Sequence, residues 1–148
     1  MFVRGSGRRL GAVLALAGTA FLHEPTAFAE PAAPPPGPRA QTTAEGHYFV
    51  VYEPRPDPIP LNQLFAVRVL VYDASDHTKR VRDVSVTVGA AMPEHNHGMN
   101  TQAMPMRTAD GDWVVDGMLF HMAGQWQLMI AVVTGMQVER ATFDIRVE

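Results

Sequence analysis

The 148-residue chain contains no cysteine. Neither a disulfide framework nor a thiolate metal site is available to it, so any metal must be held by His, Met or carboxylate side chains. Lysine is almost as scarce, because Lys79 is the only one in the sequence. A nucleic-acid surface needs clustered Lys and Arg, and we therefore expect no nucleic-acid partner.

Long apolar runs are also missing. The longest, Leu10 to Leu22, is shorter than the roughly 20 residues that span a bilayer. Arginines precede it, and the small residues Ala27-Phe28-Ala29 follow it. This arrangement predicts a cleavable signal peptide over residues 1–29, cut near Ala29. We expect a periplasmic or otherwise exported protein with no stable membrane insertion after cleavage.

The mature chain is acidic and divides into two parts. Cleavage removes three arginines and one glutamate from the 12 basic and 15 acidic residues, which leaves a formal charge of −5. Residues 30–45 are dominated by Pro and Ala and predict a disordered linker. Residues 46–148 form the expected folded domain, and about 100 residues are enough for one hydrophobic core.

The dominant hydrophobic period in this domain is two, which is typical of half-buried strands. We expect strands over residues 48–52, 65–71, 84–88, 113–118, 126–133 and 141–147, with a short seventh over 104–108. Asp, Gly and Pro punctuate the gaps, and no stretch shows a sustained helical period. The pattern predicts an all-β, immunoglobulin-like or cupredoxin-like antiparallel sandwich of about seven strands.

One stretch, M-P-E-H-N-H-G-M from Met92 to Met99, is unusually rich in soft ligands. An extended backbone would project His95 and His97 to the same side, about 7 Å apart. Gly98 permits a positive φ that would turn the chain and bring Met99 back toward them. Soft thioethers select Cu(I) and imidazole suits copper, zinc and nickel, so the mixture indicates copper first.

A methionine pair follows a few residues later. Met104 and Met106 flank Pro105, which favours extended geometry and places both thioethers on one side. Packing is the alternative explanation for this whole region, because methionine fills irregular gaps in cores. Met118 and Met129, inside predicted strands, are interpreted as such fillers.

The second cluster is F-H-M-A-G-Q-W, from Phe120 to Trp126. His121 and Met122 are adjacent and would face opposite ways in a strand, so only one can join the first cluster. The sequence leaves open which one does. Trp126 is interpreted as a core anchor between the sheets.

The other polar residues have structural interpretations. His47 and His77 are expected to be structural or solvent-exposed. Asp110, Asp112 and Asp116 are expected to be turn and strand-surface carboxylates rather than an acid/base pair. The sequence contains no Ser/His/Asp order and no phosphate-cradling glycine loop, so we expect that the protein is not an enzyme.

With both clusters described, the sequence resembles the YtkA-like family of small exported domains, which includes FixH-like proteins. The matching motifs are Met92-Pro93, His97-Gly98-Met99, Gly117 and Phe120-x-Met122-x-Gly124-x-Trp126. They fall within about the last 80 residues. The resemblance implies an immunoglobulin-like sandwich and a role in copper handling or in assembly of haem-copper oxidases.

Two functional hypotheses follow. The first is a periplasmic copper-binding module that stores copper or delivers it to an exported or membrane cuproprotein. Its primary candidate ligands are His95, His97 and Met99, and the further candidates are Met92, Met104, Met106, His121 and Met122. The second is a non-metal interaction domain that helps to assemble a membrane or periplasmic complex, with methionines as adaptable contacts.

Overall fold

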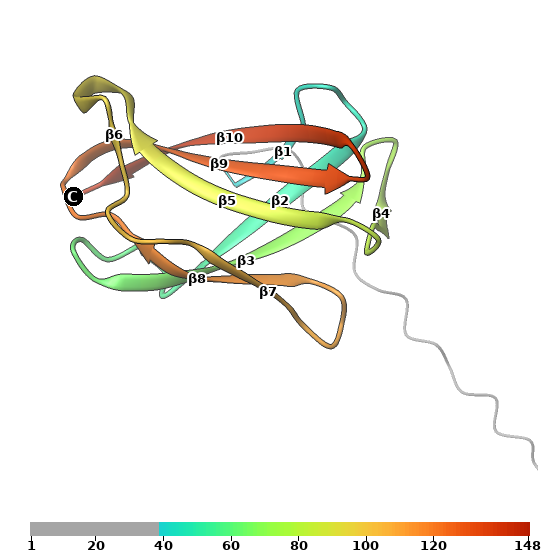
Figure 1. Ribbon diagram of the computed structural model, residues 1–148, viewed down its shortest axis with the longest axis horizontal. Helices are drawn as coiled ribbons and strands as arrows, with labels where there is room; N and C mark the ends of the chain where they lie inside the picture. The colour runs from blue at the N-terminus through green and yellow to red at the C-terminus, as the bar shows by residue number, and fades with distance from the viewer. Residues whose placement is uncertain (1–38) are drawn as a thin grey trace, which may run out of the picture.

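The computed structural model describes residues 39–148, which form two antiparallel β-sheets packed face to face (Figure 1). The predicted signal peptide and most of the predicted linker lie outside these residues. Residues 39–148 contain no candidate membrane-spanning helix.

The larger sheet has six strands, in the order β1-β2-β3-β8-β7, with β4 also paired to β3. These strands are β1 (Ala40–Thr42), β2 (Tyr48–Arg55), β3 (Leu64–Asp73), β4 (Asp76–Arg80), β7 (Met104–Arg107) and β8 (Trp113–Leu119). β1 falls inside the range 30–45 that the sequence indicated as linker, so the sandwich begins before the expected start at residue 46.

The smaller sheet has four strands, in the order β10-β9-β5-β6. They are β5 (Ser85–Met92), β6 (His97–Gly98), β9 (Gly124–Thr134) and β10 (Gln137–Val147), and the short 3₁₀ helix η1 (Pro93–His95) joins β5 to β6. The predicted all-β sandwich is confirmed. Residues 39–148 contain ten strands rather than about seven, because β1, β4 and β6 are short and carry little hydrophobic pattern.

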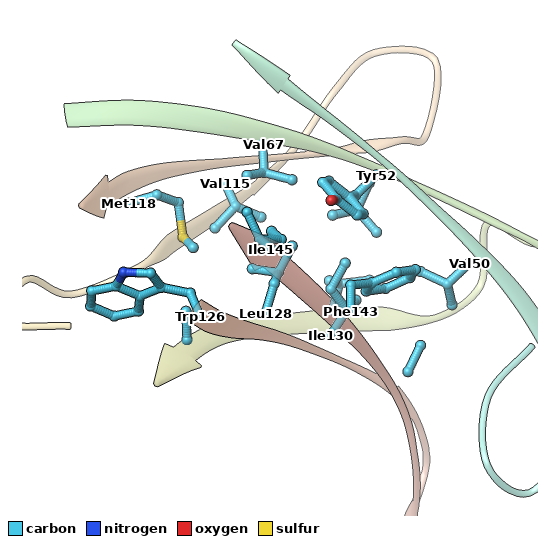
Figure 2. Packing of buried hydrophobic residues seen from close by; sticks show 14 of the residues in the cluster. Val50, Tyr52, Val67, Val115, Met118, Trp126, Leu128, Ile130, Phe143 and Ile145 are labelled. Atoms are coloured by element: carbon cyan, nitrogen blue, oxygen red, sulfur yellow. The ribbon is translucent and has the colours of Figure 1, made fainter. Parts of the chain in front are cut away.

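The core lies between the sheets (Figure 2). β10 shows the alternation most clearly, because every second residue from Glu139 to Val147 is buried. Trp126 is fully buried, as expected for an anchor between sheets, and Met118 is buried as a core filler. The same expectation was wrong for Met129, whose side chain is 37% exposed on the outer face of β9.

A β-bulge in β8 changes which residues face the core in the segment that leads to the candidate site. Val67 pairs with Val115 and Phe65 with Met118, so β8 has one residue more than β3 in this interval. Gly117 has a φ of +77°, which a residue with a side chain rarely adopts. The bulge moves the buried positions from Val115 to Met118 and then Phe120.

A buried carboxylate ties the turn after β1 to β10 in the other sheet. Glu139 accepts hydrogen bonds from the Thr43 hydroxyl at 2.7 Å and from the backbone N–H of His47 at 3.3 Å. The His47 ring nitrogen Nδ1 lies 2.7 Å from the same carboxylate. His47 is thus structural and largely exposed, as expected from the sequence.

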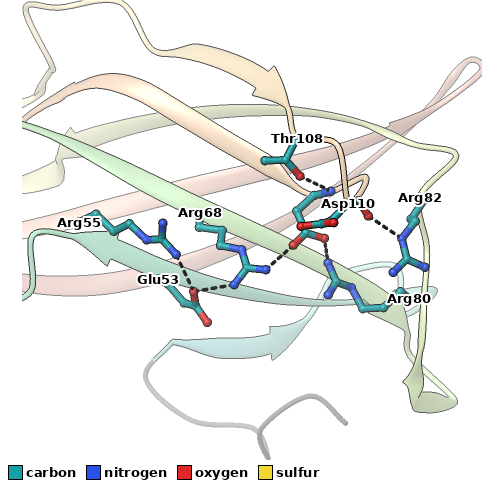
Figure 3. Close-up of polar contacts among 8 residues, drawn as sticks. Glu53, Arg55, Arg68, Arg80, Arg82, Thr108 and Asp110 are labelled. Carbon is teal, nitrogen blue, oxygen red and sulfur yellow. Dashed lines mark hydrogen bonds and ion pairs between the residues drawn. The ribbon is translucent and has the colours of Figure 1, made fainter. Parts of the chain in front are cut away.

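A second carboxylate is buried where the sequence predicted a turn or surface position, so that prediction was wrong for Asp112. Its side chain pairs with Arg68 at 2.5 Å and with Arg80. Figure 3 labels these two arginines. The Thr108 hydroxyl accepts the backbone N–H of Asp112 at 3.1 Å. This pairing could not be predicted from the sequence, because the partners come from β3 and β4.

Candidate functional site

The segment between β5 and β6 brings two of the predicted ligands together by a turn. Residues 93–95 form η1, and Asn96 follows in the left-handed conformation at φ 52°. The expected extended backbone was therefore wrong, although the ring centroids of His95 and His97 are only 5.8 Å apart. Asn tolerates the left-handed region, and this was the sequence signal for the turn.

Gly98 has a different role from the one expected. The left-handed residue in this segment is Asn96, and Gly98 lies in β6 instead. A Cβ atom at Gly98 would lie 3.2 Å from the carbonyl oxygen of Ala90, so glycine permits the close approach of β6 to β5. The Met99 N–H then donates to that Ala90 oxygen at 3.1 Å, and the Met99 side chain packs against the core.

His121 completes a row of three imidazoles at this end of the sandwich. It follows β8, and its ring centroid lies 5.1 Å from that of His97. Of the adjacent pair, His121 therefore faces the first cluster. Met122 is 40% exposed, and its backbone carbonyl accepts the indole N–H of Trp126 at 2.9 Å. We call His95, His97 and His121 the histidine row.

Trp126 forms the inner wall of the row. Its indole lies 6.0 Å from the His97 ring and 5.5 Å from the His121 ring between centroids, nearly perpendicular to both. Phe120 stacks on the same indole at 4.6 Å. The core packing of the sandwich thereby fixes the position of the inner two histidines.

One nitrogen of the row is buried and unsatisfied. Within the described chain, His121 Nδ1 is enclosed and has no hydrogen-bond partner. Leaving a buried polar group unpaired costs about 1–3 kcal/mol. His97 Nδ1 lies 3.2 Å from the carbonyl oxygen of Gly98, to which it donates, so Nε2 keeps the free lone pair of this ring.

The ring spacing suits a shared metal ion between neighbours. Metal–imidazole bonds of about 2.0 Å place a ring centre roughly 3 Å from the metal, so two rings on one tetrahedral ion have centres roughly 5 Å apart. The two observed spacings, 5.1 and 5.8 Å, lie near this value. Within residues 39–148 no three His, Asp or Glu side chains are already placed to hold an ion, so coordination requires side-chain rotation.

The remaining predicted ligands do not join the row. Met92 pairs with His97 in the β5–β6 ladder, but its side chain is buried in the core, with its Cε 2.9 Å from where a Cβ of Gly124 would stand. Met104 and Met106 share a side, as expected, but they lie in β7 of the six-stranded sheet and are 55% and 52% exposed. The histidine row, with Met99 beside it in sequence, is therefore the compact part of the predicted set.

Comparison with solved structures finds the same fold in other proteins. A copper-bound variant of FetP from uropathogenic Escherichia coli is 8% identical, with a TM-score of 0.50 over 73% of this chain and 95% of FetP. FetP as isolated gives 8% identity and a TM-score of 0.50 over 74% and 94%. A DUF4426 family protein from Pseudomonas aeruginosa gives 12% and 0.51 over 74% and 96%. At these identities the likeness concerns the fold.

No protein-family model matches the chain, and no curated protein sequence matches it.

Proposed function

We propose that this protein is an exported copper-binding module whose site is the histidine row. One observation carries the proposal: three imidazoles from η1, β6 and the end of β8 gather beside Trp126, and one of their nitrogens is buried without a partner. A metal ion bound there would satisfy the nitrogen that the fold leaves unpaired.

The chemistry of the donors supports copper. Imidazole binds copper, zinc and nickel, and Met99 adds a soft thioether in the same segment, which favours copper among these metals. One solved structure with this fold, that of a FetP variant, is copper-bound. The resemblance of Met92-Pro93, His97-Gly98-Met99 and the later motif to the YtkA-like family supports the same direction.

Storage or delivery suits the site better than catalysis. His95 is exposed in a short turn, so an acceptor protein could exchange ligands with it while the sandwich stays folded. An exported or membrane cuproprotein is the proposed acceptor. We propose binding and transfer without chemical turnover, in the periplasm, after removal of the signal peptide near Ala29.

Titration with Cu(I) and with Cu(II), each in competition with a chelator of known affinity, tests the proposal. The double substitution His97→Ala, His121→Ala should weaken copper binding at least about a hundredfold, because two of the three imidazoles are removed. His77→Ala is the matched control, since His77 lies in β4 at the opposite end of the sandwich (Figure 1). Unchanged affinity in the double variant would refute the site.

The second candidate is a partner-binding domain without metal. A groove beside Met104 on the six-stranded sheet favours it, because apolar residues dominate the lining and Leu64 is 67% exposed. Exposed methionine and leucine provide adaptable contacts to a protein surface.

Pull-down from a periplasmic extract distinguishes the two functions. If the protein is a metal module, a partner captured by the wild type should be lost with the double histidine variant or in the presence of chelator. If it is an interaction domain alone, Leu64→Asp should abolish capture, while chelator and the histidine substitutions change nothing.

A further inference from the structure

The histidine row has an order in space. His97 lies in the middle, with ring centroids 5.8 Å from His95 and 5.1 Å from His121. Trp126 has ring contacts with His97 and His121. The outer ring, His95, makes its ring contact with His97. An ion can therefore be shared by the outer pair or by the inner pair, with His97 common to both.

Exposure separates the outer histidine from the inner pair. His95 is exposed, whereas His97 and His121 are both partly buried. His121 also has an enclosed Nδ1 and lies against the fully buried Trp126. An ion arriving from solvent meets His95 first, and an ion between His97 and His121 is the one best shielded from water and competing ligands.

The backbone around His95 has less support than the backbone around His97 or His121. η1 has no buried residue and no side-chain cap, and its closing bond, from the Asn96 N–H to the Pro93 carbonyl, is 3.3 Å long. His97 instead pairs with Met92 in the β5–β6 ladder. The segment after His121 is fixed by the 2.9 Å bond from the Trp126 indole to the Met122 carbonyl. Segments with few contacts open most readily.

We propose that copper is captured at His95 and passed through His97 to His121, so that His95 governs the rate of exchange and His121 governs the affinity. This inference rests on the proposed copper-binding function. Each step forms one metal–imidazole bond before another breaks, and the oxidation state of the ion does not change. Release to an acceptor follows the reverse path through the exposed end.

Stopped-flow fluorescence with Cu(II) tests the order. Trp113→Phe in the full chain leaves Trp126 as the single indole, which paramagnetic Cu(II) quenches when it reaches the inner pair. His95→Ala should slow quenching on the order of tenfold, yet leave its final extent and the equilibrium affinity within about threefold. His121→Ala should lower the affinity at least about tenfold and reduce the quenching.

The controls distinguish the proposed order of transfer along the row from copper binding itself. Asn100→Ala, in the exposed loop after β6, should match the wild type in rate and affinity. His121→Gln provides a second inner variant, and circular dichroism checks that each variant is folded. If copper binds but His95→Ala leaves the rate unchanged, or lowers the affinity as much as His121→Ala does, the proposed order of transfer is wrong while copper binding at the histidine row is retained. If the wild type binds no copper, the order of transfer and the copper-binding function are both wrong.

Discussion

At the scale of single residues, the candidate site depends on the bulge in β8, where the alternation of buried and open residues shifts by one position. Before the bulge Val115 is buried, and after it Met118 and Phe120 are buried. His121 follows Phe120 directly, so the extra residue in β8 decides where its ring emerges beside His97. Gly117 is the residue that makes this possible, because its φ is positive and the backbone carbonyl of Gln102 occupies the space of a Cβ.

Gly117→Ala should therefore destabilise the protein by about 2 kcal/mol or more, since a strained φ and a backbone clash coincide. Urea denaturation followed by fluorescence measures the change. Gly89→Ala is the matched control, because Gly89 also lies in a strand but nothing stands within 4 Å of a Cβ there. Its effect should stay within about 1 kcal/mol and be neutral or stabilising. Equal effects of the two substitutions would contradict this account of the bulge.

At the scale of elements, the junction between β1 and β10 closes one side of the sandwich. The N–H of Ala44 donates to the Arg140 carbonyl at 2.8 Å, and the side-chain amide of Gln41 donates to the Thr142 carbonyl. Glu139 lies in phase with the buried face of β10, so its carboxylate must find partners inside. Burial alone would raise the pKa of Glu139, but hydrogen bonds from Thr43 and from the backbone and ring of His47 outweigh it and lower the pKa.

This lowered pKa predicts a dependence of stability on acid. A carboxyl whose pKa is lower in the folded state stabilises the fold fully above its unfolded pKa, about 4.3, and the contribution is lost as pH falls through the folded value. The free energy of unfolding should thus decrease below about pH 4.3. Glu139→Gln should remove part of that decrease and cost about 1–3 kcal/mol at pH 7.

Urea denaturation between pH 3 and pH 7 measures this contribution. Glu148→Gln is the control, because the Glu148 side chain is 87% exposed. A pH profile of Glu139→Gln that parallels the wild type throughout would show that the junction does not contribute in this way.

At the scale of the whole molecule, the candidate site and the hydrophobic core share the side chain of Trp126. The wall of the histidine row is Trp126, which also packs with Phe120 and Met118 between the sheets. Binding at the row should therefore stabilise the entire sandwich, since a ligand that prefers the folded state shifts the unfolding equilibrium.

Copper at a hundred times its dissociation constant should stabilise the protein by about 2.7 kcal/mol. For a domain of this size, that corresponds to a rise of roughly 10 °C in the melting temperature. Differential scanning calorimetry with and without copper measures it. His121→Ala should lose most of the rise, and His77→Ala should keep it. A copper-induced shift of equal size in both variants would place the ion elsewhere.

The long strands could be predicted because the alternation of apolar and polar residues within each one reflects its buried and open faces. Alternation in β10, and in the Val84 to Val88 stretch that continues into β5, follows from one buried and one open face. The short strands β1, β4 and β6 could not be predicted, since two to five residues carry too little pattern and are held by pairing to distant partners. The pairing of Asp112 with Arg68 and Arg80 escaped prediction for the same reason.

The sequence by itself determined the fold class, the absence of thiolate ligands and the gathering of soft donors around His95, His97 and Met99. Composition and short-range periodicity are sufficient for these conclusions. Only the tertiary structure decided that His121 rather than Met122 faces His97, and that Met104 and Met106 lie in the other sheet. These facts depend on the bulge at Gly117 and on strand order, which bring together residues far apart in the chain.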